Sequence, residues 1–197
     1  MNQSSPILVQ FFQQHPAIIA VKAVEIASVF TKREFPKNTF LLTNEKINND
    51  YMFLESGFMR AFTYDVDGNE VTTGFYSKQQ LVFEPASFFN QTPSKENIQA
   101  ITDCVGWSIT FEQLNHLFHS MPEFREFGRS ILVKGLTSLK QRMLSMINET
   151  AEERYSRMMQ SNPEILQQAS LKHIASYLGI TDTSLSRIRK EMSKRGV

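Results

Sequence analysis

The sequence is poor in cysteine, in long apolar runs and in net charge. Its single cysteine, Cys104, lies between apolar stretches, which excludes an intramolecular disulfide and leaves too few thiolates for an iron–sulfur cluster. We expect this thiol to be buried. No run of about 18 apolar residues occurs, and the N-terminus lacks the basic flank and cleavage site of a secretory signal. These absences predict a cytoplasmic protein, and 197 residues with 41% hydrophobic content allow a core plus a small second domain.

The net charge of +1 conceals an uneven distribution. Residues 168–197 hold six lysines and arginines against two acidic residues, a balance of +4, so the other 167 residues together carry −3. A basic tail on a slightly acidic body suits a protein that meets phosphates at one end, because counterion release depends on local charge. A solvated helix face would give the same pattern, so charge alone does not identify a nucleic-acid binder.

The stretch IASYLGITDTSLSRIRK, residues 174–190, has the spacing of a helix-turn-helix. Ser170 can cap a helix over 171–178 that carries apolar residues at i, i+4 spacing. Gly179 follows as the residue that tolerates a positive φ at the helix end. A second helix is predicted over 182–194. Its inner face consists of Leu185, Ile188 and Met192.

The outward face of the second helix carries hydroxyls and positive charges. If the helix enters the major groove, its N-terminal part lies nearest the bases, and the Arg187 guanidinium can reach O6 and N7 of one guanine. Residues further along are placed to meet phosphates. Thr181 is either a phosphate donor or only the cap of this helix. The candidate DNA-contacting residues are Ser170, Thr181, Asp182, Thr183, Ser186, Arg187, Arg189, Lys190 and Lys194.

Ahead of this motif the pattern is that of a small β-barrel. Short aromatic or β-branched stretches are separated by turn signals, of which Asp-Gly-Asn within 65–69 is the clearest hairpin. The segment from about Ala17 to Phe30 has the apolar content of a helix packed on the barrel. The predicted strands cover residues 39–42, 51–56, 58–64, 70–76, 80–83, 98–102 and 105–109.

A long helix is predicted over 121–148, which contains no proline after Pro122. Its apolar residues alternate by four and three, the pattern of a coiled-coil seam. The helix is longer than a barrel of this size needs for cover, which favours a two-fold dimer over packing against the barrel alone. The seam consists of Leu132, Leu136, Leu139, Met143 and Met146.

This order of parts resembles the Crp-Fnr family of bacterial transcription regulators over nearly the whole chain. The resemblance is carried by Gly57 and Arg60 in ESGFMRAF, by AEERY at 151–155, and by LKHIASYLGITDTSLSRIRK, which is similar in style to Bacteroidetes members. It implies a homodimer that reads an inverted repeat in double-stranded DNA, with RNA polymerase as a further candidate partner. Relatives follow the recognition helix with a β-hairpin wing, whereas this chain ends at Val197, so we expect the wing to be truncated or absent.

The implied fold class is α+β, in three parts. Residues 1–120 form a cyclic-nucleotide-binding-like sensor barrel of the jelly-roll type. Residues 121–148 form the dimerisation helix, and residues 149–197 the helix-turn-helix domain that binds DNA.

The resemblance also raises the question of a cyclic nucleotide. Family members that bind cyclic AMP carry a Gly-Glu pair and an Arg-Ser/Thr-Ala segment. Here Glu84 matches the glutamate, but Phe83 replaces the glycine, Pro85 removes a backbone donor, and no arginine occurs between 84 and 100. We therefore expect no response to cyclic AMP and no cofactor, with another small ligand left open. The remnants of the pocket are Phe83, Glu84, Lys95, Thr137 and Ser138.

Other functions find less support in the sequence. Among the four histidines only His116 and His119 have a helical spacing, with no cysteine or carboxylate at ligand spacing, so no metal site is expected; a haem is not excluded. A cupin-type enzyme needs histidines and a carboxylate on adjacent strands, and no phosphate-binding loop or Ser/His/Asp set occurs, so we expect no enzyme. The alternative to a DNA-binding regulator is a small-ligand signalling protein whose C-terminal helices dock a protein partner.

Overall fold

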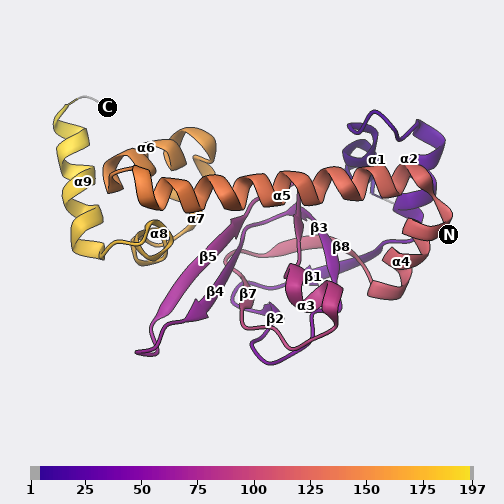
Figure 1. Ribbon diagram of the computed structural model, residues 1–197, viewed down its shortest axis with the longest axis horizontal. Helices are drawn as coiled ribbons and strands as arrows, with labels where there is room; N and C mark the ends of the chain where they lie inside the picture. Colours follow the sequence, from indigo (N-terminus) through magenta and orange to yellow (C-terminus); the bar gives the residue numbers. More distant parts are fainter. Residues whose placement is uncertain (1–4, 196–197) are drawn as a thin grey trace.

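Two antiparallel four-stranded sheets form the barrel in the first half of the chain (Figure 1). The computed structural model describes residues 5–195. One sheet has the order β1 (Thr31–Phe35), β8 (Cys104–Ile109), β3 (Tyr51–Ser56) and β6 (Gln80–Val82). The other has the order β2 (Phe40–Leu42), β7 (Asn97–Ala100), β4 (Met59–Tyr64) and β5 (Glu70–Tyr76). Seven of these strands match the predicted stretches to within two residues. Strand β1 was not predicted, because its residues TKREF are exposed except for the last and lack the usual apolar alternation.

The space between the two sheets is filled by side chains that alternate along the strands. On β4, Met59 and Ala61 point into this core, whereas Arg60 and Phe62 point to the opposite face. Gly57, at the turn from β3 to β4, has φ +96, and a Cβ there would stand 2.5 Å from the carbonyl oxygen of Asp103. Only glycine fits this turn. Gly57, one of the residues that carried the family resemblance, is therefore required here for steric reasons.

Helices and aromatic rings close one end of the barrel. The opening segment forms two helices, α1 (Pro6–Gln13) and α2 (Ala20–Ser28), instead of the single helix expected over about 17–30. Ser5 caps α1, since its hydroxyl accepts the backbone N–H of Ile7 at 3.2 Å. The rings of Phe12 and Phe127 pack 5.2 Å apart between centroids. Two further helices absent from the predictions, α3 (Pro85–Asn90) and α4 (Phe111–Ser120), flank strands β7 and β8 in sequence.

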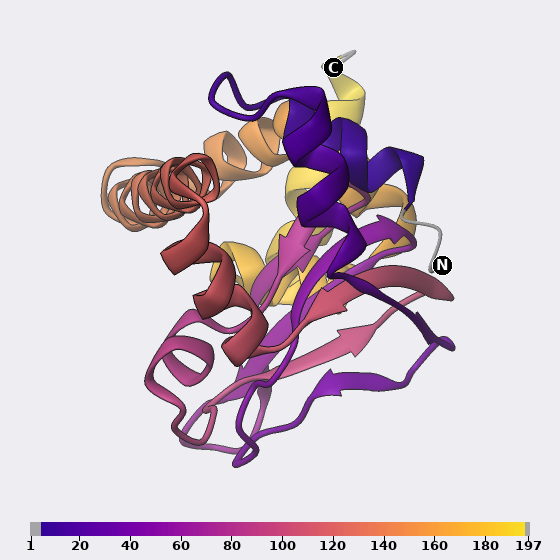
Figure 2. The same ribbon diagram turned by 90° about the vertical axis from the view of Figure 1, so that its right-hand side faces the viewer.

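The long helix α5 (Pro122–Asn148) runs along the whole molecule, with α1 and α2 at one end and the C-terminal helices at the other (Figure 1). Its first turns are buried through Phe124, Phe127 and Gly128, which anchor it to the N-terminal helices and α4. Figure 2 views the molecule nearly along this helix and shows that α5 passes beside the sheets, not between them. The sequence placed this helix correctly to within one residue at its start.

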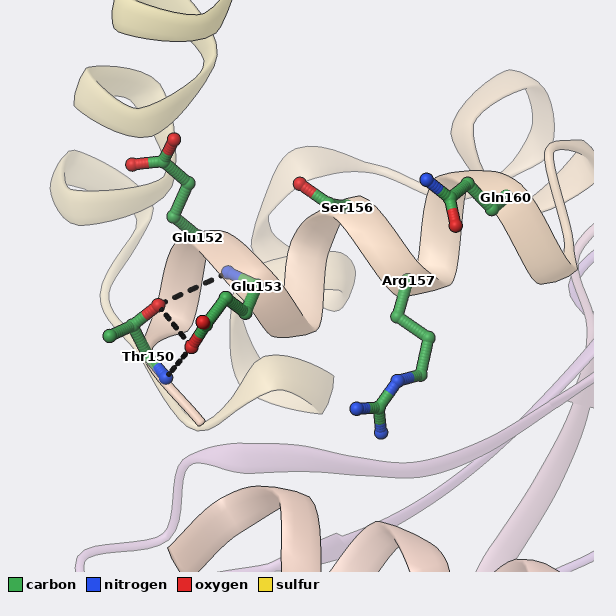
Figure 3. Close-up of a pocket in the computed structure, with 6 residues that line it drawn as sticks. All are labelled: Thr150, Glu152, Glu153, Ser156, Arg157 and Gln160. Carbon is green, nitrogen blue, oxygen red and sulfur yellow. Dashed lines mark hydrogen bonds between the residues drawn. The ribbon is translucent and has the colours of Figure 1, made fainter. Parts of the chain in front are cut away.

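Four helices follow: α6 (Ala151–Ser161), α7 (Glu164–Gln168), α8 (Leu171–Leu178) and α9 (Asp182–Lys194). Thr150 and Glu153 form a capping box at the start of α6, where the Thr150 hydroxyl accepts the Glu153 N–H and the Glu153 carboxylate accepts the Thr150 N–H (Figure 3). The core of these helices is not closed on itself. It also includes Phe58, Phe75 and Ile101 from the barrel. In the described part of the chain, no helix is long and apolar enough to cross a membrane.

Candidate nucleic-acid interface

The first helix of the helix-turn-helix, α8, has the predicted boundaries. The Ser170 hydroxyl caps it by accepting the N–H of His173 at 3.2 Å. Ile174 and Leu178 are buried on its inner face. Gly179 ends the helix with φ +69, and its N–H donates to the carbonyl of Ser176 at 3.1 Å. The cap and the end of this helix are therefore formed by local residues, which is why the sequence revealed the turn.

The second helix, α9, sits on α8 through its predicted inner face. Thr181 caps it by accepting the N–H of Ser184 at 3.2 Å. Leu185 and Met192 are buried, and Ile188 is half-buried against the same core. The remaining positions of the helix point away from this core, because three buried residues at i, i+3 and i+7 define a single face.

Every candidate DNA-contacting residue is exposed in the structure. Ser170 and Thr181 both use their hydroxyl oxygens as helix caps, so the capping role considered for Thr181 is observed. The Thr181 hydroxyl also lies 3.0 Å from the hydroxyl of Ser184. The other seven lie on α9, and five of them form a run of hydroxyl and basic groups after its first two residues. The exposed set is Ser170, Thr181, Asp182, Thr183, Ser186, Arg187, Arg189, Lys190 and Lys194.

A buried arginine beneath α8 was not recognised as part of this region. Arg60 on β4 is 1% exposed; it forms an ion pair with Glu70 of β5, and its guanidinium carbon lies 4.1 Å from the centroid of the Phe62 ring. Burial lowers the pKa of His173 on α8, Arg60 and Lys172 lower it further, and Glu70 opposes them. In the described structure, Nδ1 of His173 and two guanidinium nitrogens of Arg60 are buried without a hydrogen-bond partner. The sequence did contain a signal for this arginine. In FMRAF a charged residue stands among apolar ones, on a strand that is covered on both faces.

The remnants of a cyclic-nucleotide pocket are occupied by structural contacts. Glu84 caps α3, its two carboxylate oxygens accepting the N–H groups of Ala86 at 3.0 Å and Ser87 at 2.6 Å. Phe83 is 9% exposed, and its ring centroid lies 4.7 Å from that of Tyr51. Both residues therefore have a structural role in the closed barrel.

The other pocket candidates lie on separate elements of the chain. Lys95 is exposed, and its carbonyl accepts the hydroxyl of Thr63 at 2.8 Å. Thr137 and Ser138 are exposed on α5, and Ser138 lines a cavity of about 450 Å³ that includes Arg142 and Gln80. Burial raises the pKa of Glu96, which directly follows Lys95; the carboxylate of Glu84 raises it further, whereas a hydrogen bond with Thr73 and the charge of Arg142 lower it. Glu96 is thus influenced by the carboxylate of Glu84 and by the guanidinium of Arg142, so this region holds charges of both signs.

The predicted seam of α5 is uncovered in the isolated chain. All five of its residues are exposed, with Leu136 reaching 69%, and Val133, Leu144 and Ile147 beside them are also exposed. The barrel packs elsewhere on α5, so packing against it does not account for these side chains. Exposed apolar surface of this extent marks an interaction site. The seam residues are Leu132, Leu136, Leu139, Met143 and Met146.

Three further features are the Cys104 thiol, a metal site and a concavity on α6. Cys104 is buried, its thiol lies 3.2 Å from the carbonyl oxygen of Thr102, and burial raises the pKa of this thiol. Within residues 5–195, no three His, Cys, Asp or Glu side chains lie together as metal ligands. A concavity of about 490 Å³ follows the surface of α6, but its Thr150 and Glu153 serve the capping box (Figure 3), and its Glu152 pairs with Arg195 at 2.7 Å. That concavity carries no unused charge pattern for a ligand.

Comparison with known proteins agrees with this architecture. Residues 32–121 match the cyclic nucleotide-binding domain. The chain is 23% identical over 195 residues to the transcriptional activator protein Anr of Pseudomonas aeruginosa, covering 92% of this chain and 79% of that one.

Two solved structures share the fold. FixK2 from Bradyrhizobium japonicum has a TM-score of 0.74 at 18% identity, over 86% of this chain and 87% of that one. A transcriptional regulator of the Crp/Fnr family from Eubacterium rectale has a TM-score of 0.71 at 14% identity, over 95% of this chain and 89% of that one. The chain thus contains a cyclic nucleotide-binding domain, has an Anr relative across nearly all its length, and shares its fold with a regulator of the Crp/Fnr family.

Proposed function

We propose that this protein is a transcriptional regulator that binds double-stranded DNA as a homodimer and reads an inverted repeat through α9. The observation that carries the proposal is the exposed run of hydroxyl and basic groups on α9, held over a capped and buried inner face. A rigid helix with this face can enter the major groove, where side chains near its N-terminus reach base edges. The relative in Pseudomonas aeruginosa, a transcriptional activator, supports the same function.

The test is selection of bound fragments from genomic DNA, followed by a salt series on the selected site. We expect an inverted repeat, and an affinity that falls as salt rises because each released counterion contributes to the slope. Loss of all duplex binding at low salt, together with capture of a protein by the C-terminal helices, would favour a partner-docking protein instead. In vitro transcription from the selected promoters would then establish whether RNA polymerase is activated or blocked.

The homodimer is supported by the uncovered seam of α5. A two-fold axis beside this helix would bury the same residues from both copies, as an isologous interface requires. It would also place two α9 helices on one side of the assembly, each free to occupy a half-site.

We further propose that the regulator acts without cyclic AMP. The capping role of Glu84 and the buried Phe83 ring both oppose a cyclic phosphate. DNA binding by the purified protein, measured with and without a metabolite extract, separates an effector-free regulator from one that takes another small ligand.

A further inference from the structure

Arg142 joins three parts of the molecule through one side chain. It lies on α5, and its Nη2 donates to the carbonyl oxygen of Tyr177 on α8 at 3.2 Å. Its Nη1 donates to the carbonyl oxygen of Thr73 on β5. The guanidinium carbon lies 4.2 Å from the centroid of the Tyr177 ring, within cation–π distance. The proposed dimer helix, the barrel and the first helix of the helix-turn-helix therefore meet at this residue.

A second arginine holds the same end of α8. Nε and Nη2 of Arg154 on α6 donate to the carbonyl oxygen of Leu178 at 3.2 Å and 2.9 Å. Its Nη1 donates to the carbonyl oxygen of Glu149 at 2.6 Å. The last carbonyls of a helix have no partner within the helix, and positive charge there is favourable with the helix dipole. Both arginines thus bind the one place on α8 that needs cationic donors.

Side chains on the same last turn of α8 extend the attachment along β5. The Ser176 hydroxyl donates to Thr72 Oγ1 at 2.9 Å and accepts the Thr72 N–H at 3.1 Å. The Tyr177 ring packs 5.2 Å from the Phe75 ring, measured between centroids. A cavity of about 450 Å³ lies beside this junction, but the N–H groups of Arg142 and Arg154 that the structure pairs are directed at backbone carbonyls. The arginines serve the joint between the elements.

We infer that Arg142 is a positioning residue that sets the angle of α8 and α9 relative to α5, and thereby the distance between the two α9 helices of a dimer. The inference rests on the proposed function. Rotation of α8 carries α9 with it, because Ile174 and Leu185 share one core. The dimer seam runs along α5. The angle between α5 and α8 therefore determines the distance between the two α9 helices across the two-fold axis. Half-sites are spaced by the DNA repeat, so this separation selects the spacer.

Lysine cannot replace this side chain. Its single ammonium does not offer the flat fork of donors that reaches carbonyls on two different elements while stacking on a ring. The variant Arg142→Lys therefore keeps the charge and tests the geometry, whereas Arg142→Ala removes both. Arg129 supplies a matched control, because it lies on the same helix but is exposed and pairs only with Glu126 one turn away.

The first readout is spacer selectivity. Duplexes carry the half-site selected by the wild-type protein as an inverted repeat, with the central spacer changed one base pair at a time. We expect the wild type and Arg129→Ala to prefer one spacer by about tenfold over its neighbours, which corresponds to about 1.4 kcal/mol. Arg142→Ala and Arg142→Lys should lose most of this preference while binding an isolated half-site as the wild type does.

The second readout does not need DNA. A spin label at Ser193→Cys, exposed on α9, reports the distance between the two copies by electron–electron double resonance, and the buried Cys104 is shielded from labelling. We expect a narrow distribution for the wild type and a broad or shifted one for both Arg142 variants. If Arg142→Ala does not fold, Arg142→Lys decides the matter.

The outcomes separate the two proposals. Wild-type protein that binds no DNA but gives a narrow distance, broadened by Arg142→Lys, contradicts the DNA-binding function and keeps the positioning role. If Arg142→Lys keeps both the spacer preference and the distance distribution of the wild type, the positioning role is overturned and the proposed function stands. A monomeric wild type overturns both.

Discussion

The terminal methyl of Met146 on α5 lies beside Gly179, in the turn between the two helices of the helix-turn-helix. A Cβ added at Gly179 would stand 2.5 Å from this methyl. Met146 is still exposed on its other side, so a residue assigned to the dimer seam also contacts the DNA-reading unit. The long helix and the turn are therefore in direct contact without an intervening element.

This contact predicts the effect of Gly179→Ala. Gly179 has φ +69, a conformation that costs a residue with a Cβ about 1–2 kcal/mol, and the added methyl must also displace Met146. The free energy of unfolding, measured in urea, should fall by more than in Gly68→Ala, where φ is +81 but the Cβ meets open space. The double variant with Met146→Ala should return the cost to that of the control. Equal costs for the two glycines would mean that the Met146 contact contributes nothing.

The helix-turn-helix could be predicted from the sequence because its determinants are local. Ser170, Gly179 and Thr181 cap or end helices within a few residues of themselves, and the inner face follows from helical period. The contact of Arg142 with Tyr177 and Thr73 joins residues far apart in the chain, and no local pattern announces it. Met146 is a second example. The spacing of the apolar residues on α5 placed it on the seam but did not indicate that it contacts the turn.

The cap formed by Glu84 was also missed by sequence reasoning. Family correspondence grouped Glu84 with Ser138, yet the structure uses Glu84 as a helix cap and places Ser138 at the cavity beside Arg142. The cap forms because Pro85 starts α3, two residues after Phe83. From the sequence, Pro85 was noted only as the loss of a backbone donor. The family match gave Glu84 a ligand role and did not reveal the cap, because the cap depends on the local start of α3.

Substitution of Leu139 with glutamate should dissociate the dimer. The side chain is exposed on the seam, and two like charges facing each other across a two-fold axis cost several kcal/mol. Sedimentation equilibrium should give a dimer for the wild type at micromolar concentration and a monomer for the variant, with operator affinity lost in parallel. Val21→Glu, on the exposed side of α2, is the control and should stay dimeric. A monomeric wild type would contradict the prediction.

Titration with cyclic AMP should release no saturable heat up to about 1 mM, the concentration at which a weak site of about −4 kcal/mol would be half filled. The reason is that Glu84 is committed to capping α3 and that the Phe83 ring is buried beside Tyr51. A regulator known to bind cyclic AMP serves as the positive control for the calorimeter. Tight binding would show that Lys95 or a rearranged loop replaces the missing arginine.

Acid should destabilise the docking of α8 through His173. Its pKa is lowered in the folded protein from 6.5, so the unfolded chain binds the proton more readily. The stability contributed by the neutral ring is present above the unfolded pKa and is lost as pH falls through it toward the lower folded pKa. Melting temperatures from about pH 8 to 5 should therefore decline less in His173→Gln than in the wild type. His116→Gln, exposed on α4, should keep the wild-type slope, and an unchanged slope in His173→Gln would contradict the role of the ring.

The final prediction separates base contacts from phosphate contacts on α9. Leu185 points inward, which places Arg187 outward two residues later, early enough in the helix to reach a base edge, whereas Lys194 lies at its far end. Replacement of Arg187 with alanine should cost about 1–3 kcal/mol at the operator and little on random DNA. Replacement of Lys194 with alanine should weaken both alike and lower the salt slope by about one unit.

Specific and random duplexes, each measured over the same salt series for both variants, decide between these roles. The half-sites of the operator should lie about 10 bp apart, or a multiple of that, because the two α9 helices must meet the same face of the duplex. If Arg187→Ala weakens both kinds of DNA equally and lowers the salt slope as Lys194→Ala does, then Arg187 contacts phosphate. The base-reading residues would then have to be sought among Thr183 and Ser186, which are exposed at the start of the same helix.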